Sequence, residues 1–172
     1  IHPSGVDIRF VETTNFETNV DLSTVQGILV PGGFGSRGTE GKIAMIQHAR
    51  EQKIPYLGIC FGLQLAVVEY ARNVCRLASA NSTEIDVSTP HPVITYLPGQ
   101  NDAVSKGGTM RLGKYSCDLL AGSLMAKLYG GLVAVERHRH RYEVNPAYHS
   151  RLVENGLLLS GMSPDKRLAE FI

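Results

Sequence analysis

The sequence predicts an α/β fold: a mostly parallel sheet flanked by helices, with an antiparallel extension in its second half. Two successive strand-loop-helix units in the first half carry this prediction. The first joins a strand at 27–30 to a helix at 39–52, and the second joins a strand at 55–59 to a helix at 61–73. The second half offers strands without long helices between them, which favours antiparallel pairing.

The early units are indicated by how their strands end and how their helices repeat. Residues 27–30 form a short apolar run that stops at a Pro-Gly-Gly sequence, as a buried parallel strand does when it enters a tight loop. In the helix that follows, Ile43, Ile46 and Ala49 recur at helical spacing between polar residues. Upstream, residues 6–11 alternate apolar and polar side chains and predict a further strand.

The second half predicts five strands and two short helices. The strands are expected at 92–97, 109–112, 132–144, 157–162 and 167–172, with a turn at 163–165 between the last two. The short helices are expected at 123–129 and 146–154. No linker or internal repeat divides the chain, so we expect one domain over residues 1–172.

Composition excludes several classes of protein. The formal net charge of the 172 residues is +1, so no bulk field recruits nucleic acid or an anionic membrane. The first residues carry no secretory signal, and no apolar run is long enough to span a bilayer. The three cysteines, Cys60, Cys75 and Cys117, are too few for a disulfide framework and indicate a reducing compartment. We therefore expect a cytoplasmic protein with no nucleic-acid or membrane partner.

The most informative segment is the Gly-Ile-Cys-Phe-Gly sequence centred on Cys60. Glycines two residues either side of a nucleophile, after a strand and before a helix, are typical of a strained nucleophile elbow. The helix N-terminus would favour a thiolate, and the N–H that follows would face an oxyanion. The alternative for a lone cysteine is a small buried core residue, which the glycine pattern disfavours here. Cys75 and Cys117 lack such a setting, so we assign both to structure.

A second glycine-rich loop, residues 31–35, also follows a predicted buried strand. In a parallel sheet it would lie at the same edge as Cys60 and could supply a second oxyanion donor. A plain tight turn is the alternative. No Gly-Lys-Ser or Gly-Lys-Thr follows, so the loop is not a phosphate-binding P-loop.

With these two loops in place, the sequence resembles the class I glutamine amidotransferases. Within that family it is most similar to the domains whose ammonia serves to convert UTP to CTP. The matching stretches lie in the family's order at 30–35, 37–42, 58–69, 80–84, 107–113 and 136–145.

The resemblance implies a reaction and a set of site residues. Ammonia is released from L-glutamine through a thioester on Cys60, and it reaches a synthetase domain of the same polypeptide that lies N-terminal to this one. The resemblance gives this domain no cofactor or metal, places ATP and Mg²⁺ in the synthetase domain, and implies a homo-oligomeric full-length enzyme. The oxyanion site would be Gly33 and the N–H of Phe61. The remaining substrate-binding residues would be Gly62, Leu63 and Gln64 in the turn, Glu84 for the α-amino group and Arg141 for the α-carboxylate.

Glu84 and Arg141 have simpler interpretations as well. A site that selects a free amino acid must pair one ammonium and one carboxylate, because unpaired buried charges are costly. Without the resemblance, Glu84 would be interpreted as the carboxylate of a helix cap or of a loop. In the run at 137–141, the two histidines share one strand face and could hold zinc, but no third ligand stands beside them. Most charges of this run are expected to make structural pairs or to face water.

The family's late His-Pro-Glu motif, which supplies the base and its orienting acid, has no counterpart here. No histidine is followed two residues later by glutamate; the six are His2, His48, His91, His138, His140 and His149. We therefore expect a C-terminally incomplete domain that is inactive alone, with a naturally inactive homologue as the alternative. Two other classes stay open: a γ-glutamyl hydrolase on the same fold, and a non-enzymatic scaffold or regulatory domain.

Overall fold

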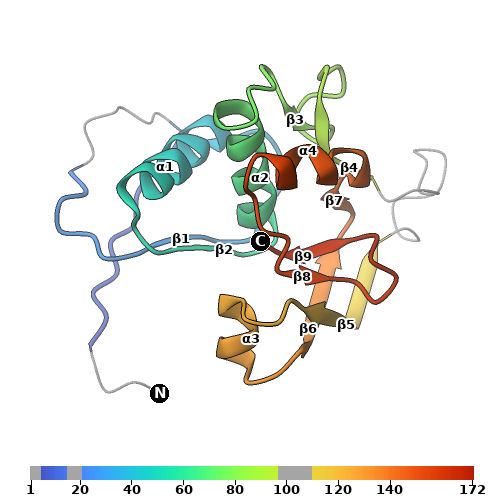
Figure 1. Ribbon diagram of the computed structural model, residues 1–172. Helices are drawn as coiled ribbons and strands as arrows, with labels where there is room; N and C mark the ends of the chain where they lie inside the picture. The colour runs from blue at the N-terminus through green and yellow to red at the C-terminus, as the bar shows by residue number, and fades with distance from the viewer. Residues whose placement is uncertain (1–4, 15–20, 97–109) are drawn as a thin grey trace.

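The computed structural model describes residues 5–14, 21–96 and 110–172 (Figure 1). The helices are α1 (Thr39–Gln52), α2 (Phe61–Asn73), α3 (Leu124–Tyr129) and α4 (His149–Glu154), with a 3-10 turn η1 (Pro146–Tyr148). The strands are β1 (Ile28–Val30), β2 (Tyr56–Gly58), β3 (Asn81–Ser82), β4 (Pro92–Tyr96), β5 (Arg111–Leu119), β6 (Val133–His140), β7 (Tyr142–Val144), β8 (Gly161–Met162) and β9 (Ala169–Phe171). Over these residues, no helix has the length and apolar character needed to cross a membrane.

The two strand-loop-helix units form as predicted. β1 and β2 pair in parallel, with Val30 opposite Gly58 at their C-terminal ends. Helices α1 and α2 begin and end at the predicted residues and lie on one side of the β1–β2 pair (Figure 1). Because parallel strands end at the same edge, the loops after β1 and β2 meet there.

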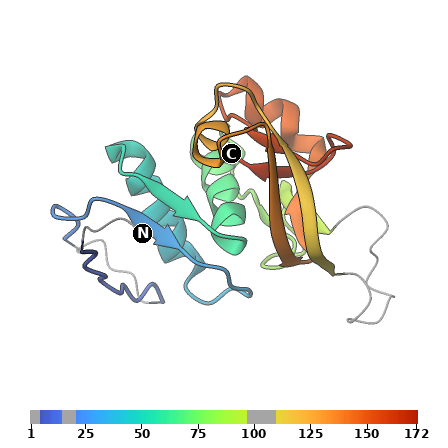
Figure 2. The same ribbon diagram turned by 90° about the horizontal axis from the view of Figure 1, so that it is seen from below.

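Helix α2 is the centre of the core. Seen from below, it stands between β1, β2 and α1 on one side and the long β5–β6 hairpin on the other (Figure 2). Its own buried residues lie on more than one face, which is typical of a helix that its neighbours cover on more than one side. Its Leu65, Val67 and Val68 pack in one buried cluster with Val93 and Ile94 of β4.

The second half forms two further sheets. β3, β4 and β7 make one sheet, in which β3–β4 is parallel and β4–β7 antiparallel. β6, β5, β8 and β9 make the other, and all its pairs are antiparallel, as the predicted extension requires. The strand expected at 132–144 is interrupted at Arg141, and the strand expected at 157–162 is confined to its last two residues. Part of the strand expected at 109–112 lies outside the described residues, and β5 continues it to Leu119.

The strand predicted at 6–11 is wrong. These residues adopt no regular structure, and Val6 and Phe10 are 82% and 93% exposed. Alternation stabilises a strand only when a neighbouring strand accepts its hydrogen bonds and one face is covered. Within the described residues, β1 pairs with β2 alone, so the apolar side chains of this segment have no sheet to join.

The β1–β2 pair is covered on one face only. Leu29 and Leu57, which are opposite each other in the register, are 57% and 55% exposed. Val30, by contrast, belongs to the buried core with α1 and α2. The short apolar runs that predicted buried strands therefore have one buried face and one bare face.

Candidate active site

The turn at Cys60 has the geometry that its sequence predicts. Cys60 follows β2 after a single residue and is the N-cap of α2. Its φ of 54° and ψ of −103° lie in a region that residues with side chains rarely adopt, which confirms the strained elbow. Strain of this kind persists only where surrounding contacts impose it, so the neighbours of Cys60 determine where the thiol sits.

Both elbow glycines are required by close backbone approaches. A Cβ atom added at Gly62 would lie 2.2 Å from the Val30 carbonyl oxygen. A Cβ atom added at Gly58 would lie 2.7 Å from the Gly62 carbonyl carbon and 2.8 Å from the Tyr56 hydroxyl oxygen. The absence of both side chains lets the first turn of α2 pack directly on the ends of β1 and β2.

The glycine loop after β1 lies against the elbow. A Cβ atom added at Gly32 would be 3.7 Å from the Cys60 Cβ, and one added at Gly33 would be 3.5 Å from the Phe61 ring. Added side chains there would be in ordinary van der Waals contact, so the loop backbone passes close to Cys60 and Phe61. The sequence placed the two loops at one sheet edge, and the structure brings them together there.

Glu84 is carried to the same edge by the segment after β3. Its carboxylate accepts a hydrogen bond from the Gly35 N–H at 3.1 Å, across 49 residues of sequence. Its own N–H donates to the Ser82 hydroxyl oxygen at 3.2 Å. The half-buried side chain is close enough to Cys60 for its charge to raise the pKa of the thiol. Glu84 therefore holds the glycine loop by a hydrogen bond and also lies near the Cys60 thiol.

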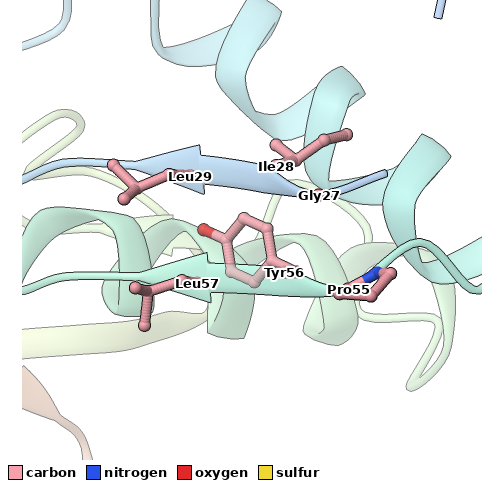
Figure 3. A pocket seen from close by; sticks show the side chains of 6 residues that line it. All are labelled: Gly27, Ile28, Leu29, Pro55, Tyr56 and Leu57. Carbon is pink, nitrogen blue, oxygen red and sulfur yellow. The ribbon is translucent and has the colours of Figure 1, made fainter. Parts of the chain in front are cut away.

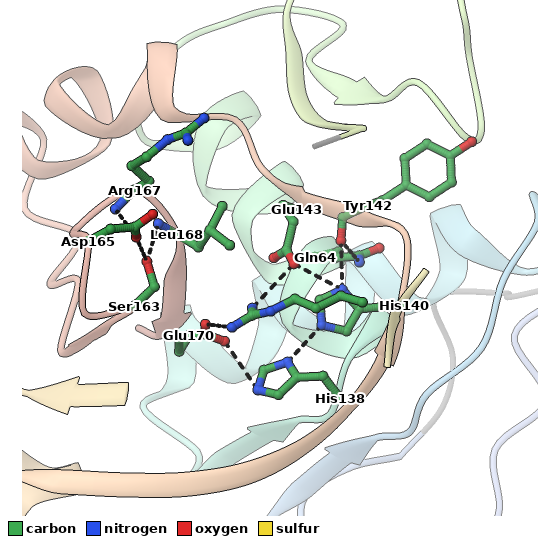
Figure 4. Close-up of polar contacts among 11 residues, drawn as sticks. Gln64, His138, His140, Tyr142, Glu143, Ser163, Asp165, Arg167, Leu168 and Glu170 are labelled. Atoms are coloured by element: carbon green, nitrogen blue, oxygen red, sulfur yellow. Dashed lines mark hydrogen bonds and ion pairs between the residues drawn. The ribbon is translucent and has the colours of Figure 1, made fainter. Parts of the chain in front are cut away.

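Gln64 joins the elbow helix to the segment that carries Arg141 (Figure 4). β6 ends at His140 and β7 begins at Tyr142, so Arg141 occupies the break between two strands. The Tyr142 carbonyl accepts a hydrogen bond from the Gln64 side-chain amide at 2.9 Å, and the His140 ring approaches the same oxygen at 3.1 Å. The Gln64 amide group is thus engaged by the backbone next to Arg141.

The other residues of the turn at 61–64, which is predicted to line the glutamine pocket, differ in their burial. The Phe61 side chain is buried in the core, so its backbone N–H is the group it can offer an oxyanion. Gly62 is buried as well, while Leu63 is half-buried. Cys75 and Cys117, expected to be structural, are both buried.

Comparison with known proteins identifies the family. A family model described as glutamine amidotransferase class-I matches residues 2–172. The chain belongs to the class I glutamine amidotransferases. The fold predicted from its sequence is that of a solved member, the Trypanosoma brucei CTPS glutaminase domain with bound acivicin. That structure matches with a TM-score of 0.86 and 37% identity, over 97% of this chain and 66% of the other.

Curated relatives of this amidotransferase domain are CTP synthases. The CTP synthase of Methanococcus maripaludis is 58% identical over 176 residues, which cover 100% of this chain and 33% of the relative. The CTP synthase of Methanocaldococcus jannaschii is 57% identical over 94% of this chain and 31% of the relative. The chain thus spans about a third of the length of the curated relatives it matches.

In this amidotransferase domain the Cys60 thiol ionises less readily than its position at a helix N-terminus predicts. Burial raises the pKa of Cys60, and the charges of Glu84 and Glu143 raise it further, whereas the Phe61 N–H lowers it. The Phe61 N–H at the helix N-terminus favours the thiolate, as expected, but its effect on the pKa of Cys60 is smaller than that of burial. Burial and two nearby carboxylates outweigh one backbone N–H group.

A buried ion network adjoins the Arg141 segment, and no sequence pattern had indicated that Arg111 and Glu170 belong to it (Figure 4). The Arg111 guanidinium contacts Glu143 at 3.4 Å and Glu170 at 2.5 Å. The rings of His138 and His140 are 2.9 Å apart at their nearest nitrogens and approach Glu170 at 3.5 Å and Glu143 at 3.3 Å. Burial raises the pKa of Glu143 to about 7. The network fixes the strands on both sides of Arg141.

The described histidines of this amidotransferase domain make no hydrogen bond to Cys60. His138 and His140 are held in the ion network, and burial lowers the pKa of both, that of His140 to about 4. Burial also lowers the pKa of His149, whose ring bonds the Val144 backbone. Among the residues that the structure describes, no three His, Cys, Asp or Glu side chains are grouped to hold a metal ion.

An apolar pocket of about 280 Å³ lies on the β1–β2 pair (Figure 3). It is lined by Gly27, Ile28, Leu29, Pro55, Tyr56 and Leu57. None of these carries a charge, whereas glutamine presents an ammonium and a carboxylate that a selective site must pair. This pocket therefore does not suit glutamine, and neither Cys60 nor Glu84 lines it.

Proposed function

We propose that this chain hydrolyses L-glutamine through a thioester on Cys60 and supplies the ammonia to a synthetase domain of the same polypeptide. That domain would convert UTP to CTP with ATP and Mg²⁺, in the cytoplasm and in a homo-oligomeric enzyme. One observation carries the proposal: a strained cysteine elbow beside a glycine loop, on a chain whose relatives are CTP synthases.

The geometry supports a two-step acyl transfer. The Cys60 sulfur attacks the side-chain amide carbon of glutamine, and the carbonyl oxygen becomes an oxyanion facing the N–H groups of Phe61 and Gly33. Collapse of this intermediate breaks the C–N bond, and the nitrogen leaves as ammonia once it has received a proton. Water then attacks the thioester, which releases glutamate and restores the thiol. Preorganised N–H donors of this kind typically contribute about 10²–10³ in rate.

Recognition of the free amino acid falls to Glu84 and Arg141. The Glu84 carboxylate would pair the α-ammonium, and the Arg141 guanidinium would pair the α-carboxylate. Support comes from their positions: Glu84 touches the glycine loop, and the residue after Arg141 is bonded to Gln64, one helical turn beyond Cys60. A ligand spanning these groups would place its side-chain amide near the thiol.

Activation of the thiol needs a base from beyond the groups that surround Cys60 here. The pKa of Cys60 is raised, and the described histidines make no hydrogen bond to its sulfur. We therefore propose that the isolated 172-residue chain has no significant glutaminase activity. A positioned acid–base group typically contributes about 10²–10⁴ in rate.

The test compares two nitrogen sources in the full-length protein. Cys60→Ala should abolish CTP formation from glutamine and leave CTP formation from ammonia at the parental rate, because ammonia bypasses the thioester. Cys75→Ala is the matched control, since Cys75 is buried away from the elbow. Retention of glutamine-dependent activity by Cys60→Ala would refute the proposed nucleophile.

A further inference from the structure

We infer that Tyr56 is a positioning residue for the Cys60 nucleophile. Its hydroxyl group holds the first turn of α2 in the place that the strained elbow requires. The inference rests on the proposed function, since it concerns the same thiol. Tyr56 acts through the backbone and does not touch the reacting atoms.

The contact joins the strand before the elbow to the helix after it. The Tyr56 hydroxyl donates a hydrogen bond to the Gly62 carbonyl oxygen at 2.8 Å. Tyr56 lies four residues before Cys60 in sequence, and Gly62 lies two residues after it. In Figure 3 the Tyr56 ring runs along β2 with its oxygen toward the Leu57 end, the end that leads to the elbow. The hydrogen bond therefore closes a short bridge across the turn.

Four of the hydrogen bonds around the turn hold its backbone, and they differ in how they can be removed. Three join backbone groups: Ile59 N–H to Val30 at 3.0 Å, Gly62 N–H to Ile59 at 3.0 Å, and Gln64 N–H to Cys60 at 3.1 Å. The fourth comes from Tyr56. Of the four, it alone comes from a side chain, so it is the one constraint that a single substitution deletes without altering the backbone.

The elbow glycines make room for this bridge. A Cβ atom added at Gly58 would lie 2.8 Å from the Tyr56 hydroxyl oxygen, so a side chain there would displace the hydroxyl from Gly62. Residues two apart on a strand share a face, which explains why the Tyr56 ring passes over Gly58. Burial raises the pKa of the Tyr56 phenol, so the hydroxyl stays a neutral donor at the pH of any activity assay.

Tyr70, in α2, provides a matched control for Tyr56. Its hydroxyl donates to the Asn155 carbonyl oxygen at 2.7 Å, the same kind of hydrogen bond, near the C-terminal end of α2. Tyr56→Phe and Tyr70→Phe each delete one hydroxyl-to-carbonyl bond and change nothing else in shape. A merely structural role for Tyr56 predicts that the two variants behave alike.

The experiment measures both variants in the full-length protein with glutamine and with ammonia. For Tyr56→Phe we expect kcat with glutamine to fall roughly threefold to tenfold, the size of effect that losing one hydrogen bond allows. KM for glutamine and the ammonia-dependent rate should stay at parental values, because the substrate pairs and the synthetase are untouched. Tyr70→Phe should keep the parental kcat. Equal kcat values for Tyr56→Phe and the parent, or equal losses in both variants, would overturn the inference.

A second substitution covers the case in which Tyr56→Phe does not fold. Incorporating 3-fluorotyrosine at position 56 keeps the ring and hydroxyl but makes the phenol a stronger donor. The positioning role predicts a glutamine kcat that differs from the parent, with ammonia-dependent activity unchanged. An identical glutamine kcat would overturn it.

The proposed function can fail separately from this inference. If the parent releases no ammonia from glutamine, or if Cys60→Ala retains that activity, the nucleophile assignment is wrong. If Cys60→Ala is inactive with glutamine and Tyr56→Phe matches the parent, the assignment stands and only the role of Tyr56 is refuted.

Discussion

Gly62→Ala tests how tightly the elbow is packed, because helix propensity predicts a more stable protein and packing predicts a less stable one. In a helix, alanine is favoured over glycine by about 1 kcal/mol. The added Cβ atom, however, would lie 2.2 Å from the Val30 carbonyl oxygen and 3.0 Å from its carbonyl carbon. A comfortable carbon–oxygen contact is about 3.3 Å, so helix and strand would have to separate by roughly 1 Å. Backbone atoms cannot rotate away as a side chain would.

The expected loss follows from these opposing terms. Adding a methyl group to a packed site costs about 1–3 kcal/mol, and a backbone neighbour places this site at the upper end. After the gain in propensity, Gly62→Ala should lose about 2 kcal/mol, which lowers the Tm of a chain this size by about 4–8 °C. Circular dichroism during heating gives the Tm of parent and variant.

Gly131→Ala is the control for this experiment. A Cβ atom added at Gly131 would have nothing within 4 Å, and its φ is not in the left-handed region. The control should therefore melt within about 1 °C of the parent, as surface substitutions usually do. If Gly62→Ala melts at or above the parental temperature, helix propensity outweighs the clash. The close approach of α2 to β1 would then not constrain the elbow.

Three further predictions concern the thiol and its substrate. Diazo-oxo-norleucine should label Cys60 and spare the buried Cys75 and Cys117, which peptide mapping will test. Because burial raises the pKa of Cys60, labelling should accelerate as the pH rises through 8 and 9. A labelling rate that does not depend on pH in that window would contradict the raised pKa. Glu84→Ala and Arg141→Ala should weaken glutamine use in the full-length enzyme and spare ammonia use, whereas equal losses with both nitrogen sources would indicate a role in folding or in the synthetase. Ammonia release from glutamine should be about 10²–10⁴ slower for the isolated chain than for the full-length protein, and full activity of the isolated chain would show that one of its own residues is the base.

Local patterns predicted the first half well because they act over short distances. Helices α1 and α2 begin and end where glycine punctuation and apolar spacing place them. The same kind of pattern failed at residues 6–11, where alternation describes what a strand would bury but supplies no partner. A helix satisfies its hydrogen bonds internally, whereas a strand depends on another segment. That difference explains why the error fell on a strand.

In the candidate site too, features encoded by neighbouring residues could be predicted, and contacts between distant residues could not. The elbow at Cys60 is encoded within five residues and could be predicted, including its unusual dihedral angles. The contact between Glu84 and Gly35 spans 49 residues, and that between Arg111 and Glu170 spans 59, so no local pattern indicates them. The net direction in which the pKa of Cys60 shifts could not be predicted for the same reason. The helix terminus is visible in sequence, but burial and neighbouring carboxylates are properties of the fold.

The bare face of the β1–β2 pair has a consequence for anyone handling the isolated chain. Leu29 and Leu57 present apolar surface to water, and in the described residues the two strands have no partner beyond each other. Unpaired strand edges beside apolar side chains are templates for pairing between molecules. At high concentration the chain should therefore associate with itself through this sheet, and Leu57→Lys should raise the concentration at which it stays monomeric.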